Sequence, residues 1–530
     1  MLSHLIWFAS ALNIIVFDHL VAATSSLNQI IKEGQTPFHA DSSVRVNAAE
    51  SYNSNSGQFT PLESLDVLSS TQFTIFGHPA FPKYSVRAKR TKFCDGTVNA
   101  YTGYIDIAAR HLFFYSFESR SNPAKDDVIL WTNGGPGCSS AVGLFMELGP
   151  CRISDERGPK FHNESWNTNA NVIFIDQPIG VGFSYAEYGE SVSTTEEAAK
   201  DIAAFVAIFF ENFRQFKGRA LHLAGESYAG RYIPLFAAEL YDQNTRLAQE
   251  GLTPINLKSI MIGNWLTDFL VMLPTHYEMQ CENGSLPPIN SISDCVAMKK
   301  ILPRCTKWLQ AECHDHFDDI DCAAATSFCQ EAIFGRFHLT GMDAALLLVQ
   351  FIMTLFLGKN PYDMSRDCES EVNGELCYAS IAHIEKYLSK PDVRTLLGVD
   401  PAVPPNFSSC DMAVNSAFER SLDMLHHTVG YVSALLERGV RVLVYAGSYD
   451  WSGNWIGNER WTLGLEWSGQ EAFASQELRE WMVDGKHAGV TRSAKGLTFA
   501  TVHAAGHMVP YDKPKEALQL LKRWLAGQQL

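Results

Sequence analysis

The sequence predicts an α/β fold with a mostly parallel central sheet, on the evidence of three apolar segments and the residue that follows each. Such short, largely apolar runs are typical of strands that are buried on both faces of a parallel sheet. The segments are Ala220–Ala224, Arg441–Tyr445 and Leu497–Val502. The loops after them carry Ser227, Asp450 and His507. Because the carboxyl ends of parallel strands meet at one edge of a sheet, these three side chains can converge.

The first strand leads directly into a serine-centred turn. It is followed by Gly225-Glu226-Ser227-Tyr228-Ala229-Gly230 and then by a predicted helix that begins near Tyr228. This arrangement resembles the Gly-x-Ser-x-Gly nucleophile elbow of α/β-hydrolases, which exposes a serine hydroxyl at the top of the sheet. Glycine is needed beside such a tight turn because larger side chains would clash.

The order of the three polar residues along the chain also fits this fold. Catalytic triads of α/β-hydrolases run serine, acid, histidine, and here Ser227 precedes Asp450 and His507. Ser227 is the predicted nucleophile, His507 the general base and then acid, and Asp450 the residue that orients the imidazole. Two backbone N–H groups should stabilise the oxyanion, and we assign them to Tyr228 and to Gly135 in a glycine-rich loop.

The length and net charge of the chain limit which folds and partners are possible. The chain has 530 residues, of which 46% are hydrophobic, so it can bury a large core. The formal net charge of −16 argues against nucleic acid or an anionic membrane surface as a partner.

The N-terminus is typical of a secreted precursor. Residues 1–23 resemble a signal peptide that ends in small residues, although a buried N-terminal helix is the alternative. Residues 24–90 are largely polar and predict a propeptide or linker. The pair Lys89-Arg90 is the expected site for a processing protease, and we expect no stable membrane anchor.

Cysteine and asparagine patterns agree with secretion. The chain has twelve cysteines, an even number that favours disulfides, and Asn-x-Ser sequons at Asn163, Asn283 and Asn406. Zinc is the alternative for Cys313-His314-Asp315-His316, but the chain lacks the clustered ligand spacing of zinc sites. We therefore expect neither a metal nor another cofactor.

Several motifs together resemble the serine carboxypeptidase family, of the fungal type, over residues from about 100 to the end. Besides the serine turn, Asp450 and Gly506–Pro510, they are Tyr101–Asp106, Trp131–Ser140 and Asp176–Tyr185. The resemblance implies an α/β-hydrolase that removes C-terminal amino acids from peptides and proteins at acid pH, through an acyl-enzyme on Ser227.

The resemblance also implies the residues that bind the substrate. A free C-terminal carboxylate would be held without arginine or lysine, by Trp131, Asn133 and Glu226, with Glu147 sharing a proton with Glu226. Two carboxyls in contact cannot both ionise easily, so this pair should retain a proton well above the usual pKa of glutamate. Trp265, Leu266 and Met508 would line the substrate pocket.

The predicted core is interrupted by a disulfide-rich cap. The core spans 91–269 and 391–530, and the cap spans 270–390. The pairs implied by the resemblance are Cys94–Cys151, Cys138–Cys410, Cys281–Cys295, Cys305–Cys329, Cys313–Cys322 and Cys368–Cys377. The apolar run Met342–Leu357 has three possible explanations: a cap helix that lines the apolar acyl-side pocket, a membrane-surface contact, or a gene-model error.

The sequence thus predicts a serine carboxypeptidase that is made as a zymogen and is secreted or vacuolar. One alternative is an acyltransferase with the same triad, which assays of acyl transfer against hydrolysis would separate. The other is a protective or binding protein, which would have an intact fold and negligible turnover.

Overall fold

The computed structural model describes residues 61–78, 80–187, 189–265, 267–334, 359–369 and 376–530. The predicted signal peptide at 1–23, the expected linker as far as residue 60, and Met342–Leu357 lie outside the described residues. So does Leu266.

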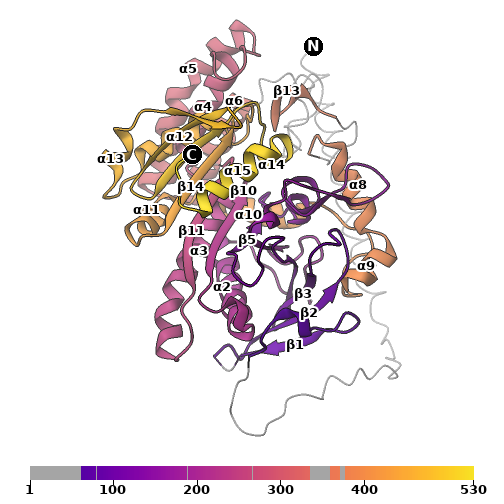
Figure 1. Cartoon of the computed structure of the whole chain (residues 1–530). Helices are drawn as coiled ribbons and strands as arrows, with labels where there is room; N and C mark the ends of the chain where they lie inside the picture. The colour runs from indigo at the N-terminus through magenta and orange to yellow at the C-terminus, as the bar shows by residue number, and fades with distance from the viewer. Residues whose placement is uncertain (1–60, 79, 188, 266, 335–358, 370–375) are drawn as a thin grey trace, which may run out of the picture. The chain divides into compact units, whose positions relative to one another are not determined.

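One mixed sheet organises the described part of the chain (Figure 1). Its strand order is β1-β2-β3-β4-β8-β5-β10-β11-β14-β17-β16-β15, and β9 pairs with β4. The six strands from β8 to β17 in this order are parallel, and the strands on either side of them are antiparallel. The predicted α/β fold with a mostly parallel central sheet is therefore confirmed.

The strands of this sheet are β1 Thr74–Gly77, β2 Tyr84–Thr91, β3 Ala100–Ile107, β4 Arg110–Phe117, β5 Val128–Thr132, β8 Asn171–Ile175, β9 Tyr185–Ala186, β10 Ala220–Glu226, β11 Asn256–Gly263, β14 Arg441–Gly447, β15 Arg479–Val483, β16 Lys486–Ala494 and β17 Leu497–Val502. Two short hairpins pair β6 Cys151–Arg152 with β7 Lys160–Phe161, and β12 Lys359–Asn360 with β13 Asp363–Asp367.

The helices are α2 Thr195–Asn212, α3 Ala229–Gln249, α4 Phe269–Cys281, α5 Ile292–Leu309, α6 Asp319–Phe334, α8 Ala379–Leu388, α9 Pro391–Leu397, α10 Met412–Arg420, α11 Val429–Glu437, α12 Trp455–Gly464, α13 Gln470–Ala474, α14 Val509–Asp512 and α15 Pro514–Leu525. Shorter helical turns are η1 Leu65–Val67, η2 Gly143–Glu147, η3 Trp166–Thr168, η4 Arg214–Phe216, η5 Gln310–Asp315 and η8 Asp423–Leu425.

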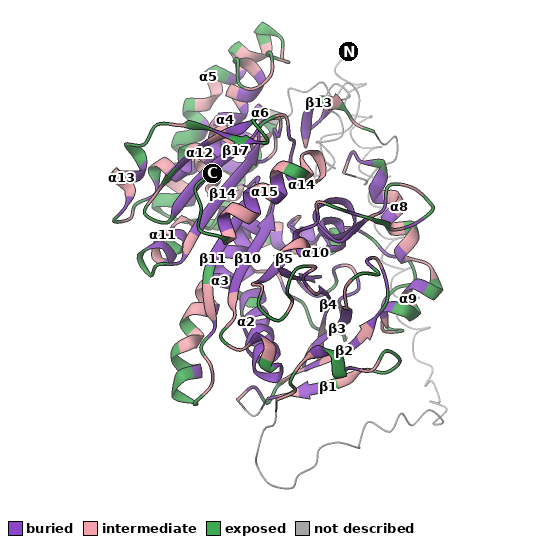
Figure 2. Ribbon diagram, in the orientation of Figure 1, coloured by how far each residue is buried: buried purple, intermediate pink, exposed green. Residues whose placement is uncertain are grey.

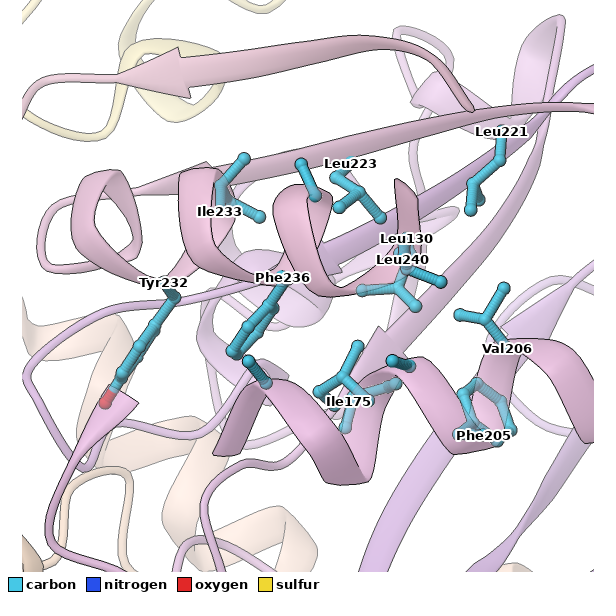
Figure 3. Close-up of a cluster of buried hydrophobic side chains, with 14 of the residues drawn as sticks. Leu130, Ile175, Phe205, Val206, Leu221, Leu223, Tyr232, Ile233, Phe236 and Leu240 are labelled. Carbon is cyan, nitrogen blue, oxygen red and sulfur yellow. The ribbon is translucent and has the colours of Figure 1, made fainter. Parts of the chain in front are cut away.

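The central strands are apolar throughout because both faces of the sheet are covered. Along β14, Val442 and Val444 belong to one core cluster, whereas Leu443 and Tyr445 belong to the other. The first cluster packs the sheet against α2 and α3, and the second packs it against η2, α8 and α15. Figure 3 shows side chains of β5, β8 and β10 facing those of α2 and α3. In Figure 2 the central strands are buried, while α5 and α13 carry exposed residues.

The structure differs from the linker predicted to extend to residue 90. Residues 74–77 and 84–91 form β1 and β2, and β2 pairs along its whole length with β3. Lys89 is buried and donates to the carbonyl of Thr395, and the backbone N–H of Arg90 donates to the carbonyl of Ser69. The expectation of an exposed dibasic site was wrong, because a protease needs an accessible, extended bond and this one lies within the sheet.

A cap is inserted between β11 and β14, as predicted. Helices α4, α5 and α6 pack together on a small core of their own, which includes Leu273, Met298 and Leu309. Three disulfides staple this core, and all six pairs expected from the resemblance are present in the structure. The remaining pairs lie in the hydrolase core and beside α8. One face of α6 turns toward the carboxyl edge of the sheet, where it lines the pocket described next.

Candidate active site

Ser227 and His507 line one pocket of about 310 Å³ at the carboxyl edge of the parallel strands. Ser227 follows β10 directly, and His507 lies on the loop after β17. Asp450 lies behind the pocket on the loop after β14, where it is fully buried. The structure therefore brings the three residues of the predicted triad together from three strand ends.

The imidazole of His507 is held in one orientation. Its Nδ1 lies 2.8 Å from Oδ2 of Asp450, and its backbone N–H donates to the carbonyl of Tyr362. The same Oδ2 accepts hydrogen bonds from the side chain of Asn264 and the backbone N–H of Gly453. Nε2 of His507 is buried and has no hydrogen-bond partner among the described residues, so it is available to a group in the pocket.

The serine turn has the strained geometry that the motif predicts. Ser227 has a φ of 62°, in the left-handed region that non-glycine residues seldom occupy. A Cβ on Gly230 would lie 1.6 Å from the ring of Trp265, so only glycine fits there. The position two residues after the serine is Ala229 rather than the glycine of the general motif. Its methyl group is accommodated because Gly225, opposite it, has no side chain.

Two backbone N–H groups border the pocket beside the serine. Gly135 follows β5, and Tyr228 precedes α3; both line the pocket. Neither N–H donates a hydrogen bond to another described residue. A Cβ on Gly134 would lie 2.2 Å from the nitrogen of Tyr228, so glycine is required where the two segments meet. This is the geometry expected of an oxyanion-binding pair.

The four residues predicted to bind a carboxylate lie close together, but only two of them line the pocket. Asn133 and Glu226 line the pocket, whereas Trp131 and Glu147 are fully buried behind them. Trp131 donates its indole N–H to Oδ1 of Asn133 at 2.7 Å, and Nδ2 of Asn133 lies 3.4 Å from Oε1 of Glu147. The geometry thus makes Trp131 a support for Asn133 rather than a direct ligand.

The two carboxyl groups of this site affect each other. Burial and the neighbouring carboxyl of Glu147 raise the pKa of Glu226 well above its usual range. Burial also raises the pKa of Glu147, although hydrogen bonds from Glu226 and Asn133 oppose that rise. A proton is therefore retained between Glu147 and Glu226 at pH values where an exposed glutamate is ionised.

The rest of the pocket comes partly from predicted residues and partly from elements that the sequence did not point to. Trp265 and Met508 line it, as predicted. Tyr362 also does, with its ring centroid 5.1 Å from that of His507. The unpredicted walls are Ala323, Thr326, Ser327 and Gln330 of α6, Phe418 and Glu419 of α10, Met424 and Leu425 of η8, and Leu422 between these two helices. The spacing of the α6 residues is that of one helix face, which is the only signal the sequence offered.

A buried ionic network supports the pocket behind Tyr228. Asp423 of η8 accepts hydrogen bonds from the guanidinium of Arg231, the hydroxyl of Tyr228, and the backbone and side chain of Thr195. Asp423 and Arg231 are 1% and 2% exposed. The network joins α2, α3 and η8 next to the wall that carries Met424.

The glycine-rich loop is fastened to the segment that precedes α10. Cys138 is bonded to Cys410, and the backbones of Gly137 and Ser139 form hydrogen bonds with Asp411 and Ser409. The side chain of Asn415 also donates to the carbonyl of Pro136. The loop of Gly135 and the helix of Glu419 are therefore tied together.

Comparisons with known proteins agree with this geometry. The sequence model of the serine carboxypeptidase family matches residues 93–527. Carboxypeptidase Y of Candida albicans is 39% identical over 450 residues, covering 84% of this chain and 77% of that protein. Carboxypeptidase Y of Komagataella phaffii is 38% identical over 452 residues, covering 84% and 80%.

The solved structure of Kex1(delta)p, described as a prohormone-processing carboxypeptidase from Saccharomyces cerevisiae, matches with a TM-score of 0.65 at 22% identity. The match covers 88% of this chain and 97% of that one, and it supports the fold. The family match, which spans most of the chain, and the identity to two carboxypeptidases Y lead to one conclusion: this chain belongs to the serine carboxypeptidase family.

Proposed function

We propose that the protein releases C-terminal amino acids from peptides and proteins at acid pH, through an acyl-enzyme on Ser227. The observation that carries the proposal is a single pocket that contains a serine beside an oriented histidine and, next to them, Asn133 and Glu226. The first pair provides acyl-transfer chemistry, and the second provides hydrogen-bonding groups for a free carboxylate.

In the first half of the reaction, Oγ of Ser227 attacks the carbonyl carbon of the last peptide bond while Nε2 of His507 accepts the hydroxyl proton. The N–H groups of Gly135 and Tyr228 stabilise the resulting oxyanion. The tetrahedral intermediate collapses, His507 gives the proton to the leaving nitrogen, and the C-terminal amino acid departs. Water then attacks the ester with His507 as base, which releases the shortened peptide and restores Ser227.

Recognition of the C-terminus follows from the carboxyl pair. No lysine or arginine lines the described part of the pocket, so the substrate carboxylate has no cationic partner there. The proton retained between Glu147 and Glu226 lets Glu226 donate a hydrogen bond to that carboxylate, beside the amide of Asn133. Above the raised pKa of Glu226 the site would become doubly negative and would repel the substrate.

Digestion of a peptide library at several pH values, followed by mass spectrometry, tests the proposal. We expect ladders that shorten one residue at a time from the C-terminus, with the N-terminus intact. Internal fragments, or ladders that shorten from the N-terminus, would show a different peptidase activity. Intact peptides at every pH would favour the alternative of a binding protein.

The pH profiles of peptides and esters should differ. As pH rises through the raised pKa of Glu226, the Michaelis constant for peptides should increase, because the deprotonated pair repels the substrate carboxylate. Ester substrates without a free carboxylate should stay active to higher pH.

The variant Glu226→Gln separates this effect from other titrations. Its amide retains a donor that does not titrate, so the Michaelis constant for peptides should depend less on pH, while Glu471→Gln on the exposed surface should leave the profile unchanged. Superimposable peptide and ester profiles in the wild type would contradict the proposed carboxylate recognition.

Passage through the secretory pathway is the expected route. The six disulfides require an oxidising compartment, and Asn163, Asn283 and Asn406 are all exposed, as glycosylation requires. No helix among the described residues is long and apolar enough to cross a membrane. We propose that the protein is secreted or vacuolar and is made as a zymogen.

A further inference from the structure

One carboxylate on the pocket wall has no role in the reaction described above. Glu419 lies on α10, on the helix face that also presents Asn415, Phe418 and the following Leu422 to the pocket. It is half-buried, and its carboxylate forms no ion pair and accepts no hydrogen bond among the described residues. Burial raises the pKa of Glu419, because part of its hydration is lost and the charge of the neighbouring Arg420 offsets that loss only in part.

The direction of the bound peptide determines which of its residues the pocket wall around Glu419 faces. The carboxylate of the last residue binds at Asn133 and Glu226, and the scissile bond lies at Ser227. The preceding part of the peptide must therefore lie on the opposite side of the scissile bond from Asn133 and Glu226. The ring of Tyr228 lies 6.2 Å from that of Phe418, which begins the wall of α10 and η8. This wall faces the acyl side of the substrate.

The composition of the wall suits a long side chain with a cationic end. Phe418, Leu422 and Met424 provide apolar surface for an aliphatic stem. Glu419 adds a negative charge, and Ser327 and Gln330 of α6 add hydrogen-bond acceptors. Lysine and arginine are both absent from the described lining, and the neighbouring Arg420 is exposed and forms no ion pair with Glu419 among the described residues.

We propose that Glu419 is a specificity-determining residue that makes the acyl-side subsite favour lysine or arginine at the penultimate position of the substrate. The ammonium or guanidinium group would pair with the Glu419 carboxylate and restore the interaction that the carboxylate lacks in the free enzyme. The inference rests on the proposed function, because it assigns a substrate preference to the same site.

The test compares N-blocked peptides that differ only in the penultimate residue: lysine, arginine, or the uncharged and similarly shaped norleucine. Values of kcat/KM are measured just below neutral pH for the wild type, Glu419→Gln and Glu419→Lys. The wild type should favour the basic peptides. Glu419→Gln should lower the ratio of lysine to norleucine about tenfold, the usual effect of losing a charge-assisted hydrogen bond. Glu419→Lys should reverse the preference.

Two controls define what would overturn the inference. Glu471→Gln, which changes the net charge equally at an exposed site on α13, should leave the ratio unchanged. A series with lysine at the C-terminal position should not respond to Glu419→Gln. An unchanged penultimate ratio in Glu419→Gln, or a response only in the C-terminal series, would refute the subsite and leave the proposed function intact. A wild type that hydrolyses none of the peptides would refute both.

Discussion

Replacing Ser227 with alanine is expected to lower kcat/KM for peptide and ester substrates by about 10⁴- to 10⁶-fold, as when a triad nucleophile is lost. The oxyanion N–H groups and the binding residues would remain, so a small residual activity is expected. The fold should persist, because no hydrogen bond joins the Ser227 hydroxyl to another residue in the described part of the chain. A variant that loses activity should therefore keep its thermal unfolding midpoint.

The control for this experiment is Ser475→Ala, which removes an exposed serine hydroxyl at the end of α13. It should retain the activity of the wild type. Labelling with a serine-directed fluorophosphonate adds an independent measurement, since the reagent should modify the wild type at Ser227 and leave Ser227→Ala unmodified. Turnover close to wild type in a correctly folded Ser227→Ala protein would exclude the serine mechanism.

Replacing Asp423 with alanine is expected to lower the free energy of unfolding by about 3–5 kcal/mol, because it leaves a buried guanidinium without its main partner. Arg231 would keep the carbonyl of His426 and the half-exposed carboxylate of Glu196. Tyr228 would lose one hydrogen bond as well, and Thr195 would lose two. Urea unfolding with the disulfides intact measures the effect.

The loss of stability caused by Asp423→Ala should also depend on pH. Burial alone would raise the pKa of Asp423, but hydrogen bonds and charge from Arg231 hold it below the usual value. A lowered folded-state pKa contributes stability above the unfolded pKa, about 3.9, and that contribution is lost as pH falls through the folded-state value. The difference between wild type and variant should therefore shrink below about pH 4.

A double variant distinguishes loss of the ion pair from loss of packing. The double variant Asp423→Leu with Arg231→Met removes both charges. Its free energy of unfolding should be higher than that of Asp423→Ala, because no buried charge is left unpaired. If the free energy of unfolding of Asp423→Ala is within about 1 kcal/mol of the wild-type value, then Arg231 finds another partner or water enters the site.

The central part of the site could be predicted from sequence because its signals are local. Ser227, Asp450 and His507 each follow a strand that is apolar enough to be identified alone, and β17 has the predicted bounds, Leu497–Val502. A parallel sheet then brings strand ends together without further information. The position of Glu147 needed the resemblance, because nothing in its own segment distinguishes a buried proton-sharing carboxyl from an exposed one.

The strands at the N-terminal edge were missed because their polar residues are paired over long range. In β2, Arg87 pairs with Asp106 and with Asp400, and Lys89 reaches the carbonyl of Thr395. The local sequence shows only charged residues before Cys94, without their distant partners, and therefore predicts a linker. The wall of α10 and α6 was missed for a similar reason, since only the tertiary fold turns one face of each helix toward Ser227.

The bond between Cys138 and Cys410 limits how this enzyme can change its substrate range over evolution. It fastens the loop that carries Gly135, a proposed oxyanion donor, to the segment that leads into α10 and the proposed acyl-side wall. Sliding α10 to widen the pocket would also displace the catalytic N–H, at a large loss of rate. Lineages that retain this link are therefore confined to exchanging side chains on a stationary scaffold, and insertions that alter specificity should accumulate in the cap instead.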